Sequence, residues 1–464
     1  MAYKTTNPYT GEVLKEFPTA TPEDIQNGIA RADATFKEWS LKPVSERVQV
    51  LAKAAEILEA KKREYAETLT LEMGKLLVEA EAEVDICVSM LRYYVENGES
   101  QLAPRYLPAQ GFGAQDVQIV NEPLGVLYAV EPWNFPYYQV VIRIGAPQFT
   151  AGNTIILKHA SNVPQSALKM VELFREAGAP EGLLVNVFAD HNATETIISD
   201  PRIRGVALTG SEAAGAVVSA IAAKHVKKST LELGGADAFI VLNDAQLDKA
   251  VEWAVFGRHW NAGQVCCSSK RVIVEEGIYQ DFLDKYKAKV AELKAGDPMN
   301  PETQLAPLSS QQAADDLGKL VEKARSEGAT VEDLGAAVPE RGAFFPPTVL
   351  TNIPLDSDTA HAEFFGPVSQ IYRARDIDHA VEIANSSPFG LGGSVFTEDK
   401  DKAYAIARRL DTGMVYINQP TGVKADIPFG GTKRSGFGRE LTDLGLHEFV
   451  NQKVVVVADI DGDF

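Results

Sequence analysis

Two adjacent cysteines, Cys266 and Cys267, are the side chains of this sequence with the clearest capacity for chemistry. They lie in the stretch Asn-Ala-Gly-Gln-Val-Cys-Cys-Ser-Ser, which spans residues 261–269. An apolar-periodic segment before it predicts a helix that stops at Gly263, and a β-rich run over residues 271–274 follows. Side chains on short connectors of this kind commonly face clefts. We therefore expect one thiol to be a nucleophile, and we expect the two side chains to point apart, as neighbours in an extended segment do.

Two further side chains could support a thiol nucleophile. Glu232, in the stretch Leu-Glu-Leu-Gly-Gly just before a predicted strand, could act as a general base that activates water. Asn134, in Pro-Trp-Asn-Phe-Pro, follows a predicted strand and could donate an amide N–H to an oxyanion. Each position also has a purely structural interpretation. Glu232 could be a solvated turn residue, Asn134 an Asx turn, and the cysteines two buried and inert thiols.

Two more stretches could bind a dinucleotide. Gly210 and Ser211 follow a predicted strand and open a predicted helix, whose backbone N–H groups could bind a pyrophosphate. In the stretch Glu-Phe-Phe-Gly-Pro-Val, Glu363 could accept hydrogen bonds from a ribose and Phe365 could pack against a nicotinamide. A capped helix and a hydrophobic turn are the structural alternatives. The Gly-x-Gly-x-x-Gly fingerprint follows none of the predicted strands, so a dinucleotide must be bound in another way.

Composition excludes several classes of function. The chain has 464 residues, 45% of them hydrophobic, and a formal net charge of −19. This charge argues against nucleic acids and anionic membranes as partners, and no apolar run is long enough to span a bilayer. The seven histidines show no metal-ligand spacing, so we expect no metal. With three cysteines and no signal-peptide core, we expect a cytoplasmic protein without structural disulfides.

The order of predicted elements indicates an α/β fold. Helices come first, with an N-cap at Thr21, followed by helices at 45–71 and 75–97, the second carrying Cys87 on its buried face. Residues 104–121 then predict a β-hairpin. Strands and helices alternate from there on, which predicts mostly parallel, doubly wound sheets. We expect strands at 125–130, 154–157, 183–187, 205–208, 238–242, 271–274 and 415–417, and helices at 165–176 and 213–223.

These motifs, in this order, resemble the aldehyde dehydrogenase superfamily. The pattern Gly-Gln-x-Cys that ends at Cys266 carries the resemblance, which extends through Pro-Phe-Gly-Gly at 428–431 and Ser-Gly-Phe-Gly-Arg-Glu at 435–440. It implies that Cys266 is the nucleophile, and that two parallel-sheet αβ domains and a β-hairpin oligomerisation arm form a homodimer or homotetramer. The implied parts are a cofactor domain at 1–103 and 122–231, a catalytic domain at 232–425, and an arm at 104–121 and 445–464 that combines the hairpin with a C-terminal strand at 454–457.

The resemblance also implies a nicotinamide cofactor. NAD-selective relatives commonly have a glutamate at the position of Ser161, where it repels a 2′-phosphate. Ser161 carries no charge and Lys158 supplies a positive one, so we expect NADP to be preferred and NAD to be used less well. Ser161 as a helix cap is the structural alternative. The cofactor residues implied are Trp133, Lys158, Ser161, Gly210, Ser211, Leu233, Glu363 and Phe365.

The substrate is predicted less directly. The stretches Leu-Gly-Gly-x-Asp at 233–237, Lys-His-Ala at 158–160 and Trp-Asn-Phe-Pro-Tyr-Tyr-Gln at 133–139 are most similar to bacterial succinate-semialdehyde dehydrogenases. Three places depart from the relatives. The stretch Ala-Asp-Ala at 236–238 stands where most of the superfamily has a lysine and a proline, Ser268 replaces a second cysteine that forms a disulfide switch, and Trp260 replaces a carboxylate-binding arginine.

Four residues are therefore predicted to contact the substrate, namely Arg143, Tyr137, Trp260 and Cys267. Arg143 could offer a bidentate fork to a carboxylate at the tunnel mouth, or could be a snorkelling surface arginine. An uncharged aldehyde is the first alternative substrate, because Trp260, Tyr137 and Tyr138 could line an apolar tunnel. A coenzyme-A-acylating enzyme is a second alternative, against which Glu232 argues, and a non-enzymatic role is a third.

Overall fold

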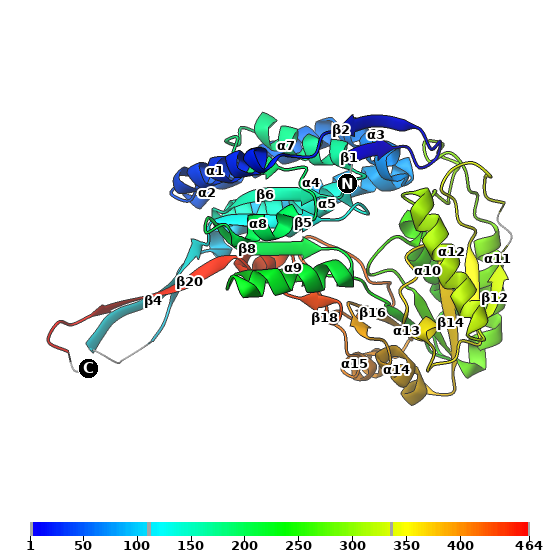
Figure 1. Cartoon of the computed structure of the whole chain (residues 1–464). Coiled ribbons are helices and arrows are strands. Elements are labelled where there is room, and N and C mark those ends of the chain that lie inside the picture. The colour runs from blue at the N-terminus through cyan, green and yellow to red at the C-terminus, as the bar shows by residue number, and fades with distance from the viewer. Residues whose placement is uncertain (1–2, 109–112, 335–336, 463–464) are drawn as a thin grey trace.

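The structure is a computed structural model, and it describes residues 3–108, 113–334 and 337–462. Two sheets with helices on both faces form the body, and a narrow three-stranded sheet projects from it (Figure 1). The strands are β1 Tyr3–Thr6, β2 Val13–Phe17, β3 Arg105–Tyr106, β4 Ala114–Pro123, β5 Val126–Glu131, β6 Thr154–His159, β7 Leu184–Asn186, β8 Ile203–Thr209, β9 Lys228–Glu232, β10 Ala238–Val241, β11 Arg271–Glu275, β12 Thr330–Asp333, β13 Thr348–Thr351, β14 Val368–Ala374, β15 Phe389–Gly390, β16 Gly393–Phe396, β17 Tyr416–Ile417, β18 Thr432–Lys433, β19 Gly436–Phe437 and β20 Val450–Ala458.

Helices precede the first sheet and then alternate with strands. The predicted N-cap is confirmed, since Thr21 and Asp24 form a reciprocal capping box at the start of the first helix. The helices are α1 Pro22–Trp39, α2 Val44–Ala60, α3 Lys62–Met73, α4 Leu77–Gln101, α5 Pro136–Tyr138, α6 Ala146–Ala151, α7 Pro164–Glu176, α8 Ala193–Ser199, α9 Glu212–Lys224, α10 Leu247–His259, α11 Tyr279–Ala291, α12 Gln311–Ser326, α13 Asp358–His361, α14 Ile377–Asn385, α15 Lys400–Ala407 and α16 Thr442–His447, with a π-helix η2 Gln139–Gly145 and 3₁₀ turns η3 Trp260–Gly263 and η4 Glu276–Ile278.

The first sheet has the order β19-β9-β8-β5-β6-β7, and all pairs except β19–β9 are parallel. The chain runs outward from β5 through β6 to β7 and then returns to the other side of β5 as β8. This reversal creates a topological switch point between β5 and β8, where doubly wound sheets bind ligands outside the carboxyl ends of their strands. The sheet thereby places the segments that follow Glu131, Thr209 and Glu232 beside one another.

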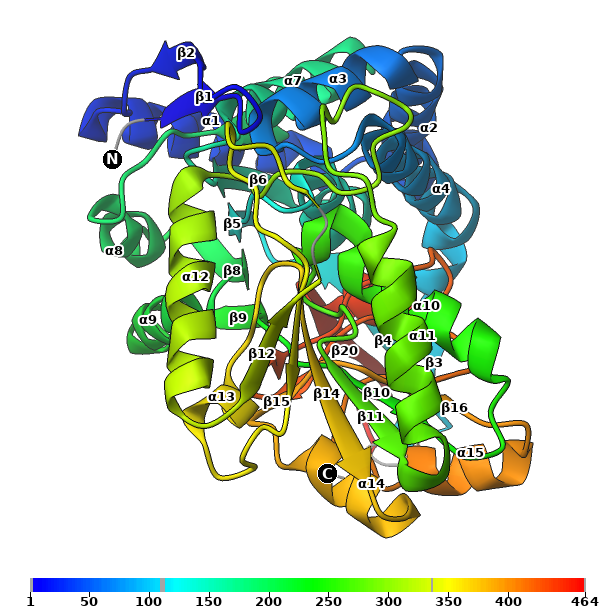
Figure 2. The same ribbon diagram turned by 90° about the vertical axis from the view of Figure 1, so that its right-hand side faces the viewer.

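The second sheet has the order β12-β13-β14-β11-β10-β16-β17 and is parallel apart from the β12–β13 pair. Its strands alternate between two apolar cores. Phe239 and Val272 pack with α10 and α11 on one face, whereas Ile240 and Ile273 pack with α12 and α14 on the other. Figure 2 shows β10, β11 and β14 side by side, with α12 to one side of them and α11 to the other. The predicted class, α/β with parallel sheets, is confirmed.

Three details of the sequence prediction were wrong. The helix expected over 45–71 is two helices, broken at Lys61, whose backbone leaves the helical region without a glycine or proline to announce the break. Strand β9, which ends at Glu232, was not predicted, whereas the strand expected after Glu232 is present as β10. Strand β10 belongs to the second sheet, so the chain crosses between sheets in the turn that begins at Leu233.

The projecting sheet consists of β3, β4 and β20. Strand β20 pairs antiparallel with β4 along its whole length, and β3 pairs with the other edge of β4. Part of the hairpin predicted over 104–121, namely residues 109–112, lies outside the described residues. The C-terminal strand predicted at 454–457 is longer, and Val454, Val456 and Val457 on it are exposed. In Figure 1 the sheet extends away from the body and carries the C-terminus near its tip.

The described residues contain neither a helix that could span a membrane nor a cluster of side chains that could hold a metal ion. None of the helices described is both long enough and apolar enough to cross a membrane. Within the same ranges, no group of three or more His, Cys, Asp or Glu side chains could hold a metal ion. The three cysteines are free, and Cys87 is buried in the core as predicted.

Candidate active site

A cleft of about 260 Å³ opens at the carboxyl ends of β5, β8 and β9. Five separate parts of the sequence line it, and they come from both sheets and their connections. The residues that line it are Pro132, Trp133, Asn134, Thr209, Gly210, Ser211, Glu232, Leu233, Gly234, Cys266, Glu363 and Phe365.

The walls of this cleft suit a nicotinamide dinucleotide. Helix α9 points its N-terminus at the cleft, and the Ser211 side chain caps that end by accepting a hydrogen bond from the backbone. A helix N-terminus attracts phosphate groups. Trp133 and Phe365 meet edge to face, with ring centroids 5.7 Å apart, and form an apolar wall. Glu363 lies against Gly234, where a Cβ atom would come within 2.1 Å of its carboxylate. The residues present therefore fit this cofactor.

A second, narrow cavity of about 30 Å³ meets the cleft at Thr209, Glu232 and Cys266. Its lining is largely apolar and aromatic. Cys266 and Glu232 border both cavities, so a molecule in either one can reach both side chains. The residues that line it are Ile86, Phe135, Tyr138, Gln139, Thr209, Glu232, Trp260, Val265, Cys266, Cys267, Val423, Phe429 and Glu440.

The turn before Cys266 departs from helical geometry. Helix α10 ends at His259, and Asn261, Ala262 and Gly263 all have positive φ angles of 51°, 52° and 77°. The helix therefore stops before Gly263, where the sequence predicted its end. Non-glycine residues in this left-handed region indicate a turn that its surroundings hold in place.

Hydrogen bonds tie this turn to the segment that carries Asn134. The Asn261 side-chain amide donates to the Asn134 carbonyl at 3.0 Å, and the Asn134 amide donates to the Gln264 carbonyl at 3.1 Å. Asn134 is thus held beside the thiol segment, and its second amide N–H has no protein acceptor among the residues the structure describes. That N–H is available for another molecule in the cleft.

Arg258 holds this turn in place, and the sequence analysis did not single it out as a functional residue. Its guanidinium is fully buried and donates to the Gly263 carbonyl at 3.2 Å, to the Ser268 hydroxyl at 2.8 Å and to three carbonyls between Phe364 and Val368. Burial lowers its pKa to about 10. One side chain therefore binds the thiol segment to the segment of Glu363 and Phe365. Its five N–H donors all have acceptors, an arrangement that a lysine could not provide.

The two thiols differ in their surroundings. Cys266 is partly exposed to the cavities, whereas Cys267 is buried. The pKa of Cys267 is raised well above the usual range, first by its hydrogen bond with Cys266 and then by burial. Because both cysteines border the narrow cavity, the expectation that their side chains point apart was wrong. Cys266 is the thiol that also faces the cleft.

Glu232 lies in a cluster of buried acids. Burial is the main cause that raises its pKa well above the usual range, the nearby charge of Glu440 raises it further, and Arg143 opposes both. Burial also raises the pKa of Glu440, against the pull of Arg143, and that of the neighbouring Glu131. Neither carboxylate oxygen of Glu232 has a hydrogen-bond partner among the residues described. The raised pKa means that this carboxyl group keeps its proton to higher pH than an exposed glutamate does.

Two predicted substrate residues lie elsewhere. Arg143 is neither at a tunnel mouth nor on the surface, because its side chain is buried and forms an ion pair with Glu440. Tyr137 is also buried, and its hydroxyl donates to the carbonyl of Tyr65 in α3. Each sits on a helical segment whose inner face packs into the core. Trp260 and Cys267 do line the narrow cavity.

Two predicted cofactor residues lie at the end of β6, apart from the lining of the cleft. Lys158 is buried, its ammonium is 5.9 Å from the ring centroid of Tyr3, and burial lowers its pKa. Ser161 borders another cavity, of about 530 Å³, together with Lys4 and Arg341. The other six predicted cofactor residues line the cleft.

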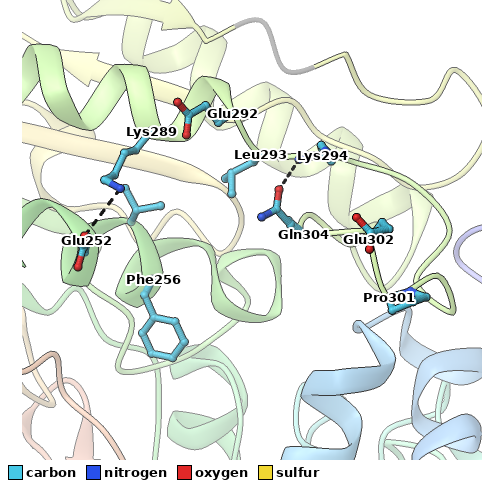
Figure 3. A pocket seen from close by; sticks show the side chains of 10 residues that line it. Glu252, Phe256, Lys289, Glu292, Leu293, Lys294, Pro301, Glu302 and Gln304 are labelled. Atoms are coloured by element: carbon cyan, nitrogen blue, oxygen red, sulfur yellow. Dashed lines mark hydrogen bonds and ion pairs between the residues drawn. The ribbon is translucent and has the colours of Figure 1, made fainter.

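The protein also has a larger surface hollow, of about 570 Å³, between α10 and α11. Figure 3 shows acidic and basic side chains around it, with Lys289 and Glu252 3.9 Å apart. None of the residues predicted to do chemistry lines it. Volume alone therefore does not identify the active site of this protein.

Comparison with known proteins gives a consistent result. A sequence model of the aldehyde dehydrogenase family matches residues 1–455. A protein of Deinococcus radiodurans named succinate-semialdehyde dehydrogenase [NADP(+)] is 48% identical over 454 residues, which are 98% of this chain and 94% of that protein. A Mycobacterium tuberculosis protein named succinate-semialdehyde dehydrogenase [NADP(+)] 1 is 43% identical over 458 residues, 99% of this chain and 100% of that protein.

Solved structures share the fold. The crystal structure of succinic semialdehyde dehydrogenase from Streptococcus pyogenes, in complex with NADP⁺ as the cofactor, superimposes with a TM-score of 0.96 at 41% identity. The match covers 99% of this chain and 100% of that one. The fold that the sequence motifs implied is thereby confirmed.

Proposed function

The chain belongs to the aldehyde dehydrogenase family, and on that premise we propose that it oxidises succinic semialdehyde to succinate with NADP as hydride acceptor. One observation carries the proposal. Cys266 and Glu232 stand where a cleft suited to a dinucleotide meets a narrow apolar cavity suited to a small aldehyde. The names of the similar proteins from Deinococcus radiodurans and Streptococcus pyogenes support both the substrate and the cofactor.

The first half of the reaction forms a thioester. The Cys266 sulfur attacks the aldehyde carbon, and the free amide N–H of Asn134 and the backbone N–H of Cys266 donate to the oxyanion that results. Neither N–H is used by a protein acceptor among the residues described. Bound NADP supplies the acceptor for the hydride that leaves this carbon. Loss of the hydride leaves an acyl group on Cys266.

The second half releases the acid. The unpartnered carboxylate of Glu232 takes a proton from water, the hydroxide attacks the thioester carbon, and the C–S bond breaks to give the acid and free Cys266. Thioester transfer to coenzyme A requires no activated water, so the position of Glu232 supports hydrolysis. The pKa of Glu232 is raised above that of an exposed glutamate, which makes its carboxylate a stronger base once it is ionised.

The narrow cavity bears on the choice of aldehyde. Among the described residues, no lysine, arginine or histidine lines it, and Tyr138, Gln139 and Trp260 are its neutral donors. This lining favours an uncharged aliphatic aldehyde as the second candidate substrate. A carboxylate needs a positive charge farther out, and we infer that Lys424, which is exposed and follows the lining residue Val423 in the sequence, provides it. We assign the carboxylate of succinic semialdehyde to Lys424.

Lys158 and Ser161 support NADP over NAD. Lys158 lies in β6 and Ser161 follows that strand, whose carboxyl end adjoins that of β5, one of the two strands at the switch point. A positive ammonium and a neutral hydroxyl there favour an additional phosphate, whereas a glutamate would oppose it. Both residues are assigned to the adenosine ribose of the cofactor.

We further propose that the protein is a homo-oligomer with the domain boundaries that the sequence implied. The exposed valines of β20 lie on the three-stranded sheet that projects from the body. Exposed apolar side chains on such a sheet are commonly buried by contact with another chain. A second copy of the chain is the natural partner. Three free cysteines, one of them the nucleophile, support a reducing compartment such as the cytoplasm.

Absorbance of reduced nicotinamide tests the substrate and cofactor together. The values of kcat/KM are measured for succinic semialdehyde and for butanal, each with NADP and with NAD, and the acid product is quantified. We expect the highest value for succinic semialdehyde with NADP. A clear preference for butanal would remove the succinate assignment and leave the aldehyde chemistry, whereas acyl-coenzyme A formation without acid would overturn the hydrolytic half-reaction.

A further inference from the structure

Lys270 lies at the junction between the thiol segment and β11 and is buried, with 1% of its surface exposed. Its ammonium has three N–H donors, and each has an acceptor. The acceptors are the Val265 carbonyl at 2.7 Å, the Cys266 carbonyl at 2.6 Å and a carboxylate oxygen of Glu363 at 3.1 Å. A buried charge without partners is strongly destabilising, so this complete set of partners fixes the ammonium in place.

The two carbonyls flank the nucleophile. The Val265 carbonyl and the Cys266 N–H belong to one planar peptide group and point in opposite directions. Binding of that carbonyl by Lys270 therefore turns the Cys266 N–H away from the ammonium. Binding of the Cys266 carbonyl fixes the next peptide plane as well. With both planes held, the φ and ψ angles of Cys266 are set, and so is the direction in which its sulfur leaves the backbone.

The third partner belongs to the cofactor cleft. Glu363 also accepts a hydrogen bond from the Gly235 N–H at 3.0 Å. A Cβ on Gly235 would lie 2.6 Å from the Cys266 carbonyl oxygen, which is a backbone atom that cannot turn aside. The glycine pair that follows Leu233 thus lets the nucleophile's carbonyl and the carboxylate of Glu363 approach the same ammonium.

Asp237 completes the electrostatic surroundings of Lys270. Its carboxyl group is buried and accepts a hydrogen bond from the Gly392 N–H at 3.0 Å. The pKa of Asp237 is raised to about 6 by burial, although the charge of Lys270 lowers it.

We propose that Lys270 is a positioning residue that holds the peptide planes on both sides of Cys266 and the carboxylate of Glu363 in one rigid frame. Through the first contact it aims the Cys266 N–H at the oxyanion, and through the second it presents Glu363 to the cofactor ribose. The proposal rests on the proposed function for the identity of the cofactor, but its geometric part concerns the free enzyme and requires no particular aldehyde.

The test measures thiol labelling and cofactor binding in addition to turnover. Lys270→Met is made in a Cys267→Ala background, so that iodoacetamide reports on Cys266 without cofactor. We expect the second-order rate of labelling to fall roughly tenfold and the Kd of NADP, from calorimetry, to rise by a similar factor. Lys270→Arg keeps the positive charge but replaces the ammonium by a planar guanidinium. It should therefore restore part of the labelling rate and part of the NADP affinity. Lys433→Met, at a partly exposed lysine whose ammonium donates to the Asn385 carbonyl, is the matched control.

A double-mutant cycle separates positioning from general damage to the fold. In a Glu363→Gln background, Lys270→Met should weaken NADP binding no further, while its effect on labelling persists. Circular dichroism and elution volume show whether each variant is folded. If Lys270→Met does not fold, labelling and NADP affinity are compared between wild type and Lys270→Arg instead. Unchanged labelling and unchanged NADP affinity in a folded variant would overturn the proposal, as would equal losses of affinity in both backgrounds. The aldehyde assignment would survive that outcome, since it depends on wild-type rates alone.

Discussion

Arg143 forms a buried ion pair with Glu440, and this pair sets the electrostatic surroundings of Glu232. The two side chains are only 2% and 5% exposed, so water screens their charges little. Glu440 raises the pKa of Glu232 and Arg143 lowers it. Arg143, which was predicted to bind the substrate, therefore lowers the pKa of Glu232, the proposed general base, while it is paired with a residue 297 positions away in the sequence.

A Glu440→Gln variant tests this electrostatic role through pH. Glu232 acts as a base only when ionised, so hydrolysis of the thioester should accelerate as pH rises through its pKa. Removal of the Glu440 charge lowers that pKa, because Arg143 is then unopposed, and the rising limb of the hydrolysis rate should move to lower pH. The rate of acid release in a single turnover, measured at a series of pH values, gives the position of this rising limb.

The same variant leaves Arg143 buried without its partner, which costs about 3–5 kcal/mol of stability. Rates are therefore compared only at pH values where circular dichroism shows a folded protein. Glu382→Gln, at an exposed position of α14, is the control and should leave the limb in place. If the rising limb of the hydrolysis rate stays at the same pH or moves to higher pH in Glu440→Gln, the role given to Glu440 is contradicted.

The choice between the two sulfurs is tested by single substitutions. Cys266→Ser should abolish formation of reduced cofactor, whereas Cys267→Ala should retain most of it, because the Cys267 thiol is buried and its pKa is raised. Mass spectrometry after denaturation in mid-turnover should find the acyl group on the peptide that contains Cys266. Acylation that survives in Cys266→Ser would mean that Cys267 is the nucleophile.

Cofactor selectivity is tested at Ser161. A glutamate there places a negative charge beside the 2′-phosphate, so Ser161→Glu should cost about 1–3 kcal/mol in kcat/KM for NADP and affect NAD far less. Ser161→Gln has a similar size without the charge and separates electrostatics from shape. Equal losses for both cofactors in Ser161→Glu would show that the serine does not face the phosphate.

The carboxylate of the substrate is tested at Lys424. Lys424→Met should raise the KM for succinic semialdehyde about tenfold and leave that for butanal unchanged, because only the first aldehyde carries a charge. Lys400→Met, at the exposed first residue of α15, is the matched control. Parallel changes for both aldehydes would assign Lys424 to the shape of the tunnel instead of its charge.

The sequence predictions were most accurate for features that depend on residues close together in the chain. The capping box at Thr21, the buried runs of β5 and β6, and the helix opening after Ser211 each follow from side-chain type and spacing. The segments of Asn134, Glu232 and Cys266 were also chosen from the sequence, and the structure brings all three to one place. Parallel strands with known ends explain why such distant segments meet.

The contacts that sequence reasoning missed are long-range and polar. Most of the acceptors of Lys270 and Arg258 are backbone carbonyl groups, which every residue possesses, so no side-chain pattern predicts these contacts. Arg143 was placed on the correct helical segment, but its partner Glu440 is 297 residues away and only the tertiary fold pairs them. The break at Lys61 likewise carries no glycine or proline signal.

The most direct test of the account is the time course of reduced cofactor in Glu232→Gln, mixed rapidly with succinic semialdehyde and NADP. Cys266 should still attack and hydride should still leave, so we expect a burst of one NADPH per active site, followed by steady turnover at least ~100-fold slower than wild type, which is the usual contribution of a general base. Loss of the burst together with turnover would contradict the account, because Glu232 would then be needed before the thioester forms.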